Sequence, residues 1–268
     1  MTILTVVTDQ NNKGLNSFLK PSTDRFNLNL TILIANQDSY KSHRRKDAIL
    51  HNYLQEIDDE EIILFTDGYD AMFLSGEDEI LTKFFKTQKE LLFSAEVNCW
   101  PDESLSAEYP MEMSQFKYLC SGGFIGKAGF VKRKIEENLE TISTRRYAFS
   151  NQIYWTEMFL RNTAQIGLDT KCEVFATLSS KEDIEFLTQL KSQRKGKEHV
   201  NNYMKLKVDW FNNTFYIKDR RLCVLPTNDT KPCHVHANGF SKVLLDEIAR
   251  NLDIIPQDPI LERFFTRK

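Results

Sequence analysis

Two aspartates, Asp67 and Asp70, stand three residues apart directly after the largely apolar segment Glu61–Thr66. Such a segment is typical of a buried parallel strand, and the ligands of open α/β sheets gather at the carboxyl ends of the strands. Because Gly68 allows a sharp turn, both carboxylates can converge on one hard divalent cation such as Mg²⁺ or Mn²⁺. A turn with two solvated acids is the alternative that the spacing leaves open.

A phosphatase of the haloacid type is a rival at this point, because it also begins with a strand that ends in Asp. Its pattern needs a second acid two residues after the first. This chain has Tyr69 there, which counts against the phosphatase.

A second group of metal-ligand types is formed by Cys233, His234 and His236. In a strand the cysteine faces one side and the two histidines the other, so at most two of the three converge. Neutral imidazole suits Mn²⁺, Zn²⁺ or Fe²⁺, whereas a thiolate favours zinc. One histidine completing an Asp–Asp–His site is the economical hypothesis, and a hydrogen-bonded histidine within a β segment is the alternative for either one.

The residues Asn238 and Gly239 lie where a helix is expected to begin, over Ser241–Leu252. Free backbone N–H groups at a helix N-terminus bind phosphate, and Lys242 would add a positive charge one turn in. A phosphate group and a divalent ion are natural neighbours in one site.

Two further strand ends carry residues suited to a sugar. Ser121–Gly123 would end an apolar strand and let a bulky ring approach the backbone closely. Glu96 follows another apolar run, with Trp100 shortly after it, and a carboxylate beside an apolar ring is typical of a sugar site. The alternatives are a simple tight turn and a core tryptophan.

These residues must be positioned by alternating strands and helices in the first half of the chain. Strands are predicted at Ile3–Thr8, Leu28–Ala35, Glu61–Thr66, Glu90–Ala95 and Tyr118–Gly126. Helices are predicted between the first two strands, at Asp47–Ile57 and at Glu77–Gln88. This alternation predicts a doubly wound α/β fold.

The second half is less regular. A helix is expected at Gln152–Arg161, a solvated charged loop near Lys191–Glu198, and a β-rich region over Tyr203–Val224. Since no repeat or low-complexity linker appears, we expect one continuous domain over residues 1–268.

The composition limits the class of protein. With 41% hydrophobic and 27% charged residues, the 268-residue chain is neither collagen-like nor natively disordered. A net charge of −3 gives no general attraction to nucleic acid or anionic membranes, and Lys41–Lys46 is the only basic cluster. Five scattered cysteines predict reduced, mostly buried thiols. Neither a membrane span nor a signal peptide is visible, so a cytoplasmic location is the default expectation.

Four motifs resemble a known family in their order and spacing. They are Ile63–Asp70, Leu92–Pro101, Ser121–Gly126, and His236–Gly239 with Lys242. Over roughly residues 3–252 the chain is similar to the glycosyltransferase domain of the multifunctional procollagen lysyl hydroxylases. The resemblance implies a GT-A fold, a doubly wound and mostly parallel sheet with helices on both faces. Residues 1–126 would bind the nucleotide sugar, and residues 127–268 would bind the acceptor and complete the metal site.

The resemblance also implies an activity. A hexose, expected to be glucose, would pass with retention from UDP-glucose or UDP-galactose to hydroxylysine or galactosylhydroxylysine of a collagen-like chain. Mn²⁺ would be the cofactor, with Mg²⁺ as a substitute. We expect no nucleic-acid or membrane partner, and a homodimer stays open. The alternatives are a related transferase with another acceptor and a non-catalytic collagen- or sugar-binding module.

Residue roles follow from the positions within the motifs. The metal ligands would be Asp67, Asp70 and His236. The nucleoside and diphosphate would be held by Thr8, Tyr40, Lys46, Tyr69, Asn238, Gly239 and Lys242. The sugar and acceptor side would be lined by Glu96, Trp100, Ser121, Gly122, Gly123, Asn151 and Gln152.

One departure from the family pattern affects the expected catalytic residues. Ser150 and Asn151 stand where the family carries carboxylates beside the sugar donor. Asn151 would supply only a dipole there, and Gln152 or Glu96 could take over the role of the missing charge. The alternative is that Asn151 caps the helix that begins at Gln152.

Overall fold

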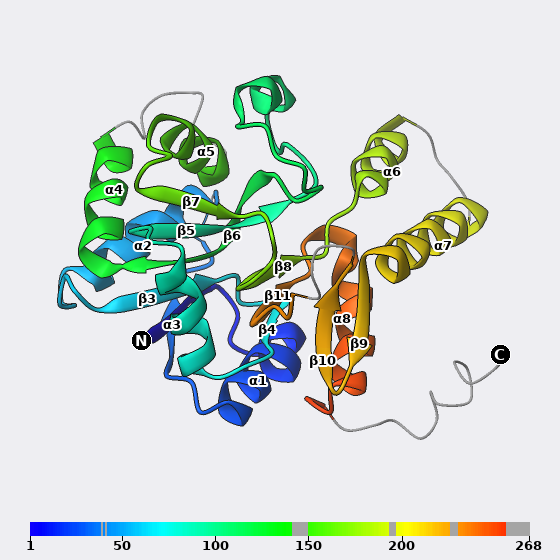
Figure 1. Cartoon of the computed structure of the whole chain (residues 1–268), viewed down its shortest axis with the longest axis horizontal. Coiled ribbons are helices and arrows are strands. Elements are labelled where there is room, and N and C mark those ends of the chain that lie inside the picture. The colour runs from blue at the N-terminus through cyan, green and yellow to red at the C-terminus, as the bar shows by residue number, and fades with distance from the viewer. Residues whose placement is uncertain (39, 41, 141–149, 193–196, 226–229, 256–268) are drawn as a thin grey trace.

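A computed structural model describes the chain except for residues 39, 41, 141–149, 193–196, 226–229 and 256–268 (Figure 1). Its centre is a six-stranded sheet with the order β2-β1-β3-β6-β5-β7. These strands are β1 (Thr2–Val7), β2 (Leu30–Ile34), β3 (Ile62–Thr66), β5 (Leu91–Glu96), β6 (Tyr118–Lys127) and β7 (Ile166–Asp169). All five strands predicted from the sequence are present, with ends shifted by no more than a few residues.

The sheet is mostly parallel, as expected, but β6 runs antiparallel to both β3 and β5. Ser121–Gly123 lie within β6 rather than at its end, so the expectation that they end a strand is wrong. Because β6 is antiparallel, its first half reaches the edge of the sheet where β3 and β5 end. Thr66 pairs with Gly123 there, and Glu96 pairs with Tyr118.

Helices cover both faces of the sheet. One face packs against α2 (Arg44–Leu54), α4 (Ala128–Glu140) and α5 (Asn151–Arg161), and the other against α1 (Lys20–Arg25) with the preceding helical turn Leu15–Leu19 and against α3 (Glu77–Lys86). Alternation along β3 explains the two cores, since Ile63 and Phe65 enter the first and Leu64 the second. Helix α4 was not predicted from the sequence.

A second, three-stranded sheet adjoins the carboxyl edge of the first. Its order is β4 (Ala71–Phe73), β11 (His234–His236) and β8 (Phe175–Thr177). β11 pairs antiparallel with β4, and this register sets His236 opposite Ala71, the residue after Asp70. The remaining elements are α6 (Lys181–Ser192), α7 (Lys197–Thr214), the hairpin β9 (Phe215–Lys218) and β10 (Arg221–Val224), α8 (Lys242–Asn251) and the 3₁₀ turns Glu103–Glu108 and Gly239–Ser241.

The β-rich region expected over Tyr203–Val224 is largely wrong. Helix α7 runs to Thr214, and only the β9–β10 hairpin that follows is extended. Tyr203, Lys207 and Thr214 are buried at intervals of four and seven residues, which is the period of a helix face rather than of a strand. The charged stretch is also not a simple loop, because α6 extends to Ser192 and α7 begins at Lys197, while residues 193–196 lie outside the described part.

The cysteines agree with the expectation of reduced, mostly buried thiols. All five cysteines are free thiols, and four of them are buried. Among the described residues, no helix combines the length and the apolar character needed to cross a bilayer.

The antiparallel strand β6 is anchored by one aromatic ring. Phe124 packs against Phe65, Phe93 and Trp155 with ring centroids 5.0, 5.2 and 6.0 Å away. We predict that Phe124→Ala lowers the free energy of unfolding by about 3–5 kcal/mol, because apolar burial is lost and a cavity remains. Urea denaturation measures this, with Phe85→Ala at a 56% exposed position of α3 as the control. Equal losses in both variants would contradict the assignment.

Candidate active site

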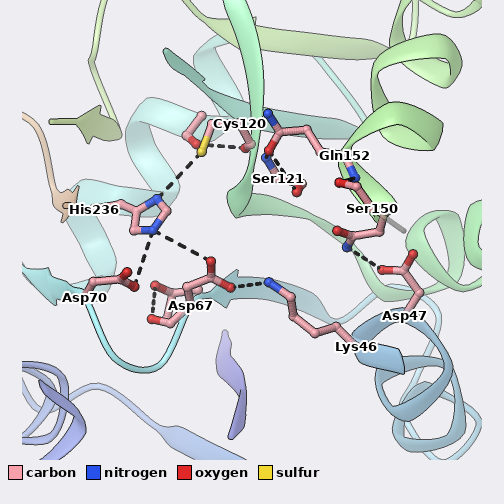
Figure 2. A network of polar contacts seen from close by, with 12 residues as sticks. Lys46, Asp47, Asp67, Asp70, Cys120, Ser121, Ser150, Gln152 and His236 are labelled. Atoms are coloured by element: carbon pink, nitrogen blue, oxygen red, sulfur yellow. Dashed lines mark hydrogen bonds and ion pairs between the residues drawn. The ribbon is translucent and has the colours of Figure 1, made fainter. Parts of the chain in front are cut away.

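Three residues that the sequence analysis assigned to a metal lie together at the carboxyl edge of the sheet. Asp67 follows β3, Asp70 precedes β4 and His236 ends β11. One ligand atom of each lies within 4.8 Å of the others. The Nε2 atom of His236 is 3.7 Å from Asp67 Oδ2 and 3.4 Å from Asp70 Oδ1, and Figure 2 shows the imidazole edge turned toward both carboxylates. We call these three residues the acidic cluster.

Gly122 allows the acidic cluster to form against β6. The N–H of Asp67 donates to the Gly122 carbonyl at 2.9 Å. A Cβ at position 122 would lie 2.2 Å from the His236 ring and 3.1 Å from an Asp67 oxygen, so any side chain there would displace the cluster. Gly123 faces away, because a Cβ there would meet Phe175 at 3.2 Å. Of the two glycines, Gly122 is therefore the one that shapes the site.

The acidic cluster fits a divalent cation. The Nε2 atom of His236 is buried without a hydrogen-bond partner, although both carboxylates are near. Burial lowers the pKa of His236, but the Asp70 carboxylate outweighs this and holds the pKa well above its usual value, so a bound cation would have to displace the ring proton. Two carboxylates and an imidazole form a donor set that suits Mn²⁺.

Each carboxylate of the acidic cluster is also paired with a lysine. Lys46 Nζ, from α2, is 2.6 Å from Asp67 Oδ1, and Lys242 Nζ, from α8, is 3.1 Å from Asp70 Oδ2. Burial would raise the pKa of Asp70, but His236 and Lys242 hold it below its usual range. Two ammonium groups therefore lie beside the cluster, where they could also meet a diphosphate.

A cavity of about 190 Å³ opens on one side of the acidic cluster. We call it the smaller lobe. It gathers the expected nucleoside and diphosphate residues Thr8, Tyr40, Lys46, Tyr69 and Lys242. The Tyr69 hydroxyl accepts hydrogen bonds from the backbone N–H groups of Thr8 and Asp9 at 2.8 and 2.6 Å, which ties the Asp67–Asp70 turn to the end of β1.

A second cavity of about 330 Å³, the larger lobe, opens on the other side. It shares His43, Lys46, Asp67 and Asp70 with the smaller lobe, so the acidic cluster lies between the two. Its lining includes six residues expected on the sugar and acceptor side, namely Glu96, Trp100, Ser121, Gly122, Asn151 and Gln152. Asn238 and Gly239, which were expected at the diphosphate, line this lobe and not the smaller one. Gly123 is absent from this lining.

Glu96, the last residue of β5, is a buried carboxylate with three donors. Its Oε1 accepts from Gln152 Nε2 at 2.9 Å, and its Oε2 accepts from Ser179 Oγ at 3.0 Å and from Asn238 Nδ2 at 3.4 Å. Burial raises the pKa of Glu96 to about 7, although these hydrogen bonds lower it. The carboxyl group can therefore exchange a proton near neutral pH.

The N-terminus of α5 places Asn151 and Gln152 in the larger lobe. Ser150 caps the helix, since its Oγ accepts from the Gln152 N–H. The expected capping alternative for Asn151 is therefore wrong. Its side-chain amide instead donates to Asp47 Oδ1 at 3.0 Å. The Gln152 amide links Glu96 to Ser121, because its oxygen accepts from the Ser121 N–H and hydroxyl at 3.2 Å.

His234, the other histidine of the motif, belongs to the core. Its Nε2 lies 2.7 Å from Thr66 Oγ1, and its ring packs edge-on against Phe73 and Phe175. Burial lowers the pKa of His234 to about 3, so the ring is neutral. One histidine thus faces the carboxylates and the other is a hydrogen-bonded position in a strand.

Several residues of the site were not found from the sequence. His43, Asn98, Ser179 and Asp183 also line the larger lobe. Asn98 lies inside the motif Leu92–Pro101 and His43 lies in the basic cluster Lys41–Lys46, so the sequence had already marked the segments that contain them. Ser179 and Asp183 come from the link between β8 and α6 and from α6 itself, where no local pattern marks them.

Comparisons with known proteins concern the family and the fold of the chain. A family model described as the PLOD GT domain matches residues 1–255. Procollagen-lysine,2-oxoglutarate 5-dioxygenase of Drosophila melanogaster is 34% identical over 188 residues, which cover 70% of this chain and 22% of that protein. Procollagen-lysine,2-oxoglutarate 5-dioxygenase 2 of Mus musculus is 29% identical over 263 residues, 92% of this chain and 30% of that protein. The chain thus spans less than a third of the length of these relatives.

Solved structures support the fold. A glycosyltransferase involved in glycosylation of the major capsid of PBCV-1 matches with a TM-score of 0.54 at 9% identity, over 95% of this chain and 98% of that one. The galactosyltransferase LgtC, in complex with donor and acceptor sugar analogs, matches with a TM-score of 0.50 at 12% identity, over 98% and 99%. The expected GT-A fold is therefore confirmed. The expectation of a cytoplasmic location has no support from these comparisons. With its family model matched over residues 1–255, the chain belongs to the family of PLOD GT domains.

Proposed function

We propose that this glycosyltransferase domain moves a hexose from a UDP-sugar, with retention, to hydroxylysine or galactosylhydroxylysine of a collagen-like chain. Glucose is the proposed hexose and Mn²⁺ the proposed cofactor, with Mg²⁺ as a substitute. The observation that carries the proposal is the acidic cluster between two lobes. A nucleotide on one side and a sugar with its acceptor on the other would bring the diphosphate over the carboxylates.

The smaller lobe would hold the departing nucleotide. Asp67, Asp70 and His236 would bind the cation, whose charge would offset the negative charge that UDP gains as the glycosidic bond breaks. Lys46 and Lys242 would donate to the diphosphate oxygens and stabilise the same charge in a partly desolvated site. The Tyr69 ring would lie beside the nucleoside.

The larger lobe would hold the hexose and the acceptor. Glu96, held by Gln152 and Ser179, would orient a sugar hydroxyl and could accept a proton from the attacking group, given its pKa of about 7. Trp100, which is 48% exposed, would offer its ring to the apolar face of a sugar. Gln152 would fix the positions of Glu96 and Trp100 relative to each other, because its amide donates to Glu96 and to the Trp100 carbonyl.

A non-catalytic collagen- or sugar-binding module is the second candidate. Asn151, which lines the larger lobe where the family pattern has a carboxylate, favours it. A UDP-release assay over several UDP-sugars with Mn²⁺, with and without a galactosylhydroxylysine peptide, separates the candidates. We expect the fastest release from UDP-glucose with the peptide. Release that ignores the peptide would indicate another acceptor, and no release from any donor would indicate the binding module.

The acidic cluster gives a prediction about metal. Asp70→Asn should weaken Mn²⁺ binding at least tenfold and abolish UDP release, because one anionic ligand is replaced by a neutral amide. Calorimetric Mn²⁺ titration measures the binding, and EDTA should stop release by the parent until Mn²⁺ is restored. Asp78→Asn, at an exposed position of α3, is the matched control. Full activity of the Asp70 variant in EDTA would reject the assignment.

Lys242 gives a prediction about the donor. A hydrogen bond to a charged group contributes roughly 1.5–3 kcal/mol, so Lys242→Met should weaken UDP binding about tenfold or more. Calorimetry with UDP and Mn²⁺ tests this. The control is Lys218→Met, at an exposed position of β9. Unchanged UDP affinity in the first variant would place Lys242 away from the diphosphate.

The contact between Asn151 and Asp47 gives a prediction about charge. Asn151→Asp would set two buried carboxylates side by side, so we expect about 1–3 kcal/mol of lost stability. Asp47→Asn combined with Asn151→Asp restores a donor and an acceptor and should recover most of that loss in urea denaturation. If position 151 faces the reacting carbon of the sugar, turnover of the double variant should differ from the parent by at least about tenfold, with UDP affinity nearly constant. Turnover within twofold would show that the charge at 151 has no catalytic role.

A further inference from the structure

The ammonium group of Lys207, on α7, is enclosed in the protein. The side chain is 0% exposed, and its Nζ donates to the Leu178 carbonyl at 2.7 Å, to Asp183 Oδ2 at 2.6 Å and to Ser180 Oγ at 3.3 Å. It also lies 4.6 Å from the centroid of the Trp210 ring. A buried ammonium is retained only when its charge and its three donors are matched, and all three donors are matched here.

All three acceptors belong to the short segment Leu178–Asp183, which comprises the link after β8 and the first residues of α6. Ser179, in this segment, donates its hydroxyl to Glu96 Oε2 at 3.0 Å. The Ser180 carbonyl accepts from the Asn98 amide at 2.9 Å, which ties the segment to the loop after β5. One side of the segment therefore contacts Lys207, and the other contacts Glu96 and its neighbours.

Helix α6 continues from this segment into the wall of the larger lobe. Asp183, Ile184 and Leu187 line the lobe. Asp183 cannot turn freely toward a ligand, because its Oδ1 accepts from the Tyr203 hydroxyl and its Oδ2 from Lys207 and from the Ser180 N–H at 2.7 Å. The two α7 residues thus fix the first turn of α6.

We propose that Lys207 is a positioning residue for the acceptor side of the active site, acting through Ser179 on Glu96 and through Asp183 on the wall formed by α6. The inference rests on the proposed transferase function, but it assigns Lys207 no contact with substrate. The effect of Lys207 should be confined to the larger lobe, because none of its hydrogen-bond partners lines the smaller lobe. Loss of the ammonium should therefore weaken binding of the acceptor and leave binding of the nucleotide unchanged.

Lys207→Met tests the proposal by keeping the apolar stem and removing the charge. We expect the KM for a galactosylhydroxylysine peptide to rise about tenfold, since small misplacements in a site have large kinetic effects, while the calorimetric Kd for UDP with Mn²⁺ stays within twofold. Hydrogen exchange followed by mass spectrometry should be at least tenfold faster over residues 178–187 and unchanged over residues 62–70. The control is Lys205→Met, the same change at an exposed position one half-turn earlier.

A double-mutant cycle with Ser179→Ala separates positioning from simple stabilisation. If Lys207 acts in part through Ser179, the two changes together should impair peptide transfer by clearly less than the product of their separate effects. Additive effects, or unchanged peptide kinetics in folded Lys207→Met, would overturn the proposal. If this variant does not fold, Tyr203→Phe, which removes only the hydroxyl bound to Asp183, should give the same pattern at about threefold, and unchanged kinetics would overturn it.

Loss of transferase activity and loss of the Lys207 contacts have different readouts. A parent protein that releases no UDP from any donor would refute the proposed function. Exchange over residues 178–187 would still decide the positioning role, because it needs no substrate. Equal exchange in parent and Lys207→Met would refute that role even in an active enzyme.

Discussion

Repulsion between Asp67 and Asp70 is the constraint on which the rest of the structure depends. Two carboxylates held in one turn need positive charge nearby, since like charges at this distance in a partly buried place destabilise the fold. The chain brings His236 from β11, Lys46 from α2 and Lys242 from α8 to meet them. Each of these elements must pack correctly for the charges to balance, so the electrostatics of one turn ties together the two sheets and two helices.

The acidic cluster lies between the two lobes, and each lobe is lined by different elements. The smaller lobe, proposed for the nucleotide, is lined by the ends of β1 and β3 and by α2 and α8. The larger lobe, proposed for the sugar, is lined mainly by β5, β6, α5 and the link before α6. β6 joins the two sides, because its antiparallel direction brings Gly122 under the acidic cluster and Ser121 against Gln152.

Sequence patterns predicted the features that depend on residues close together in the sequence. The apolar run before Asp67, the motif around Glu96 and the pair formed by His236 and Lys242 marked most of the site, and the family resemblance fixed the GT-A fold. The direction of β6 could not be predicted, because a buried strand reads as the same apolar run in either direction. Helix α7 was missed because its aromatic residues favour strands locally, and their helical spacing is visible only once their burial is known. Ser179 and Lys207 gave no signal, since their partners are 83 and 24 or more residues away in sequence.

The position of β11 has a consequence for biosynthesis. This strand lies between β4 and β8 in the small sheet, yet it is made some 160 residues after β4. A nascent chain that has emerged only as far as β10 therefore carries two strands with no shared partner and two aspartates without their histidine. Both defects are removed in one event when β11 enters the gap, so completion of the small sheet and assembly of the acidic cluster coincide. Synthesis must therefore reach His236 before the three candidate ligands can meet.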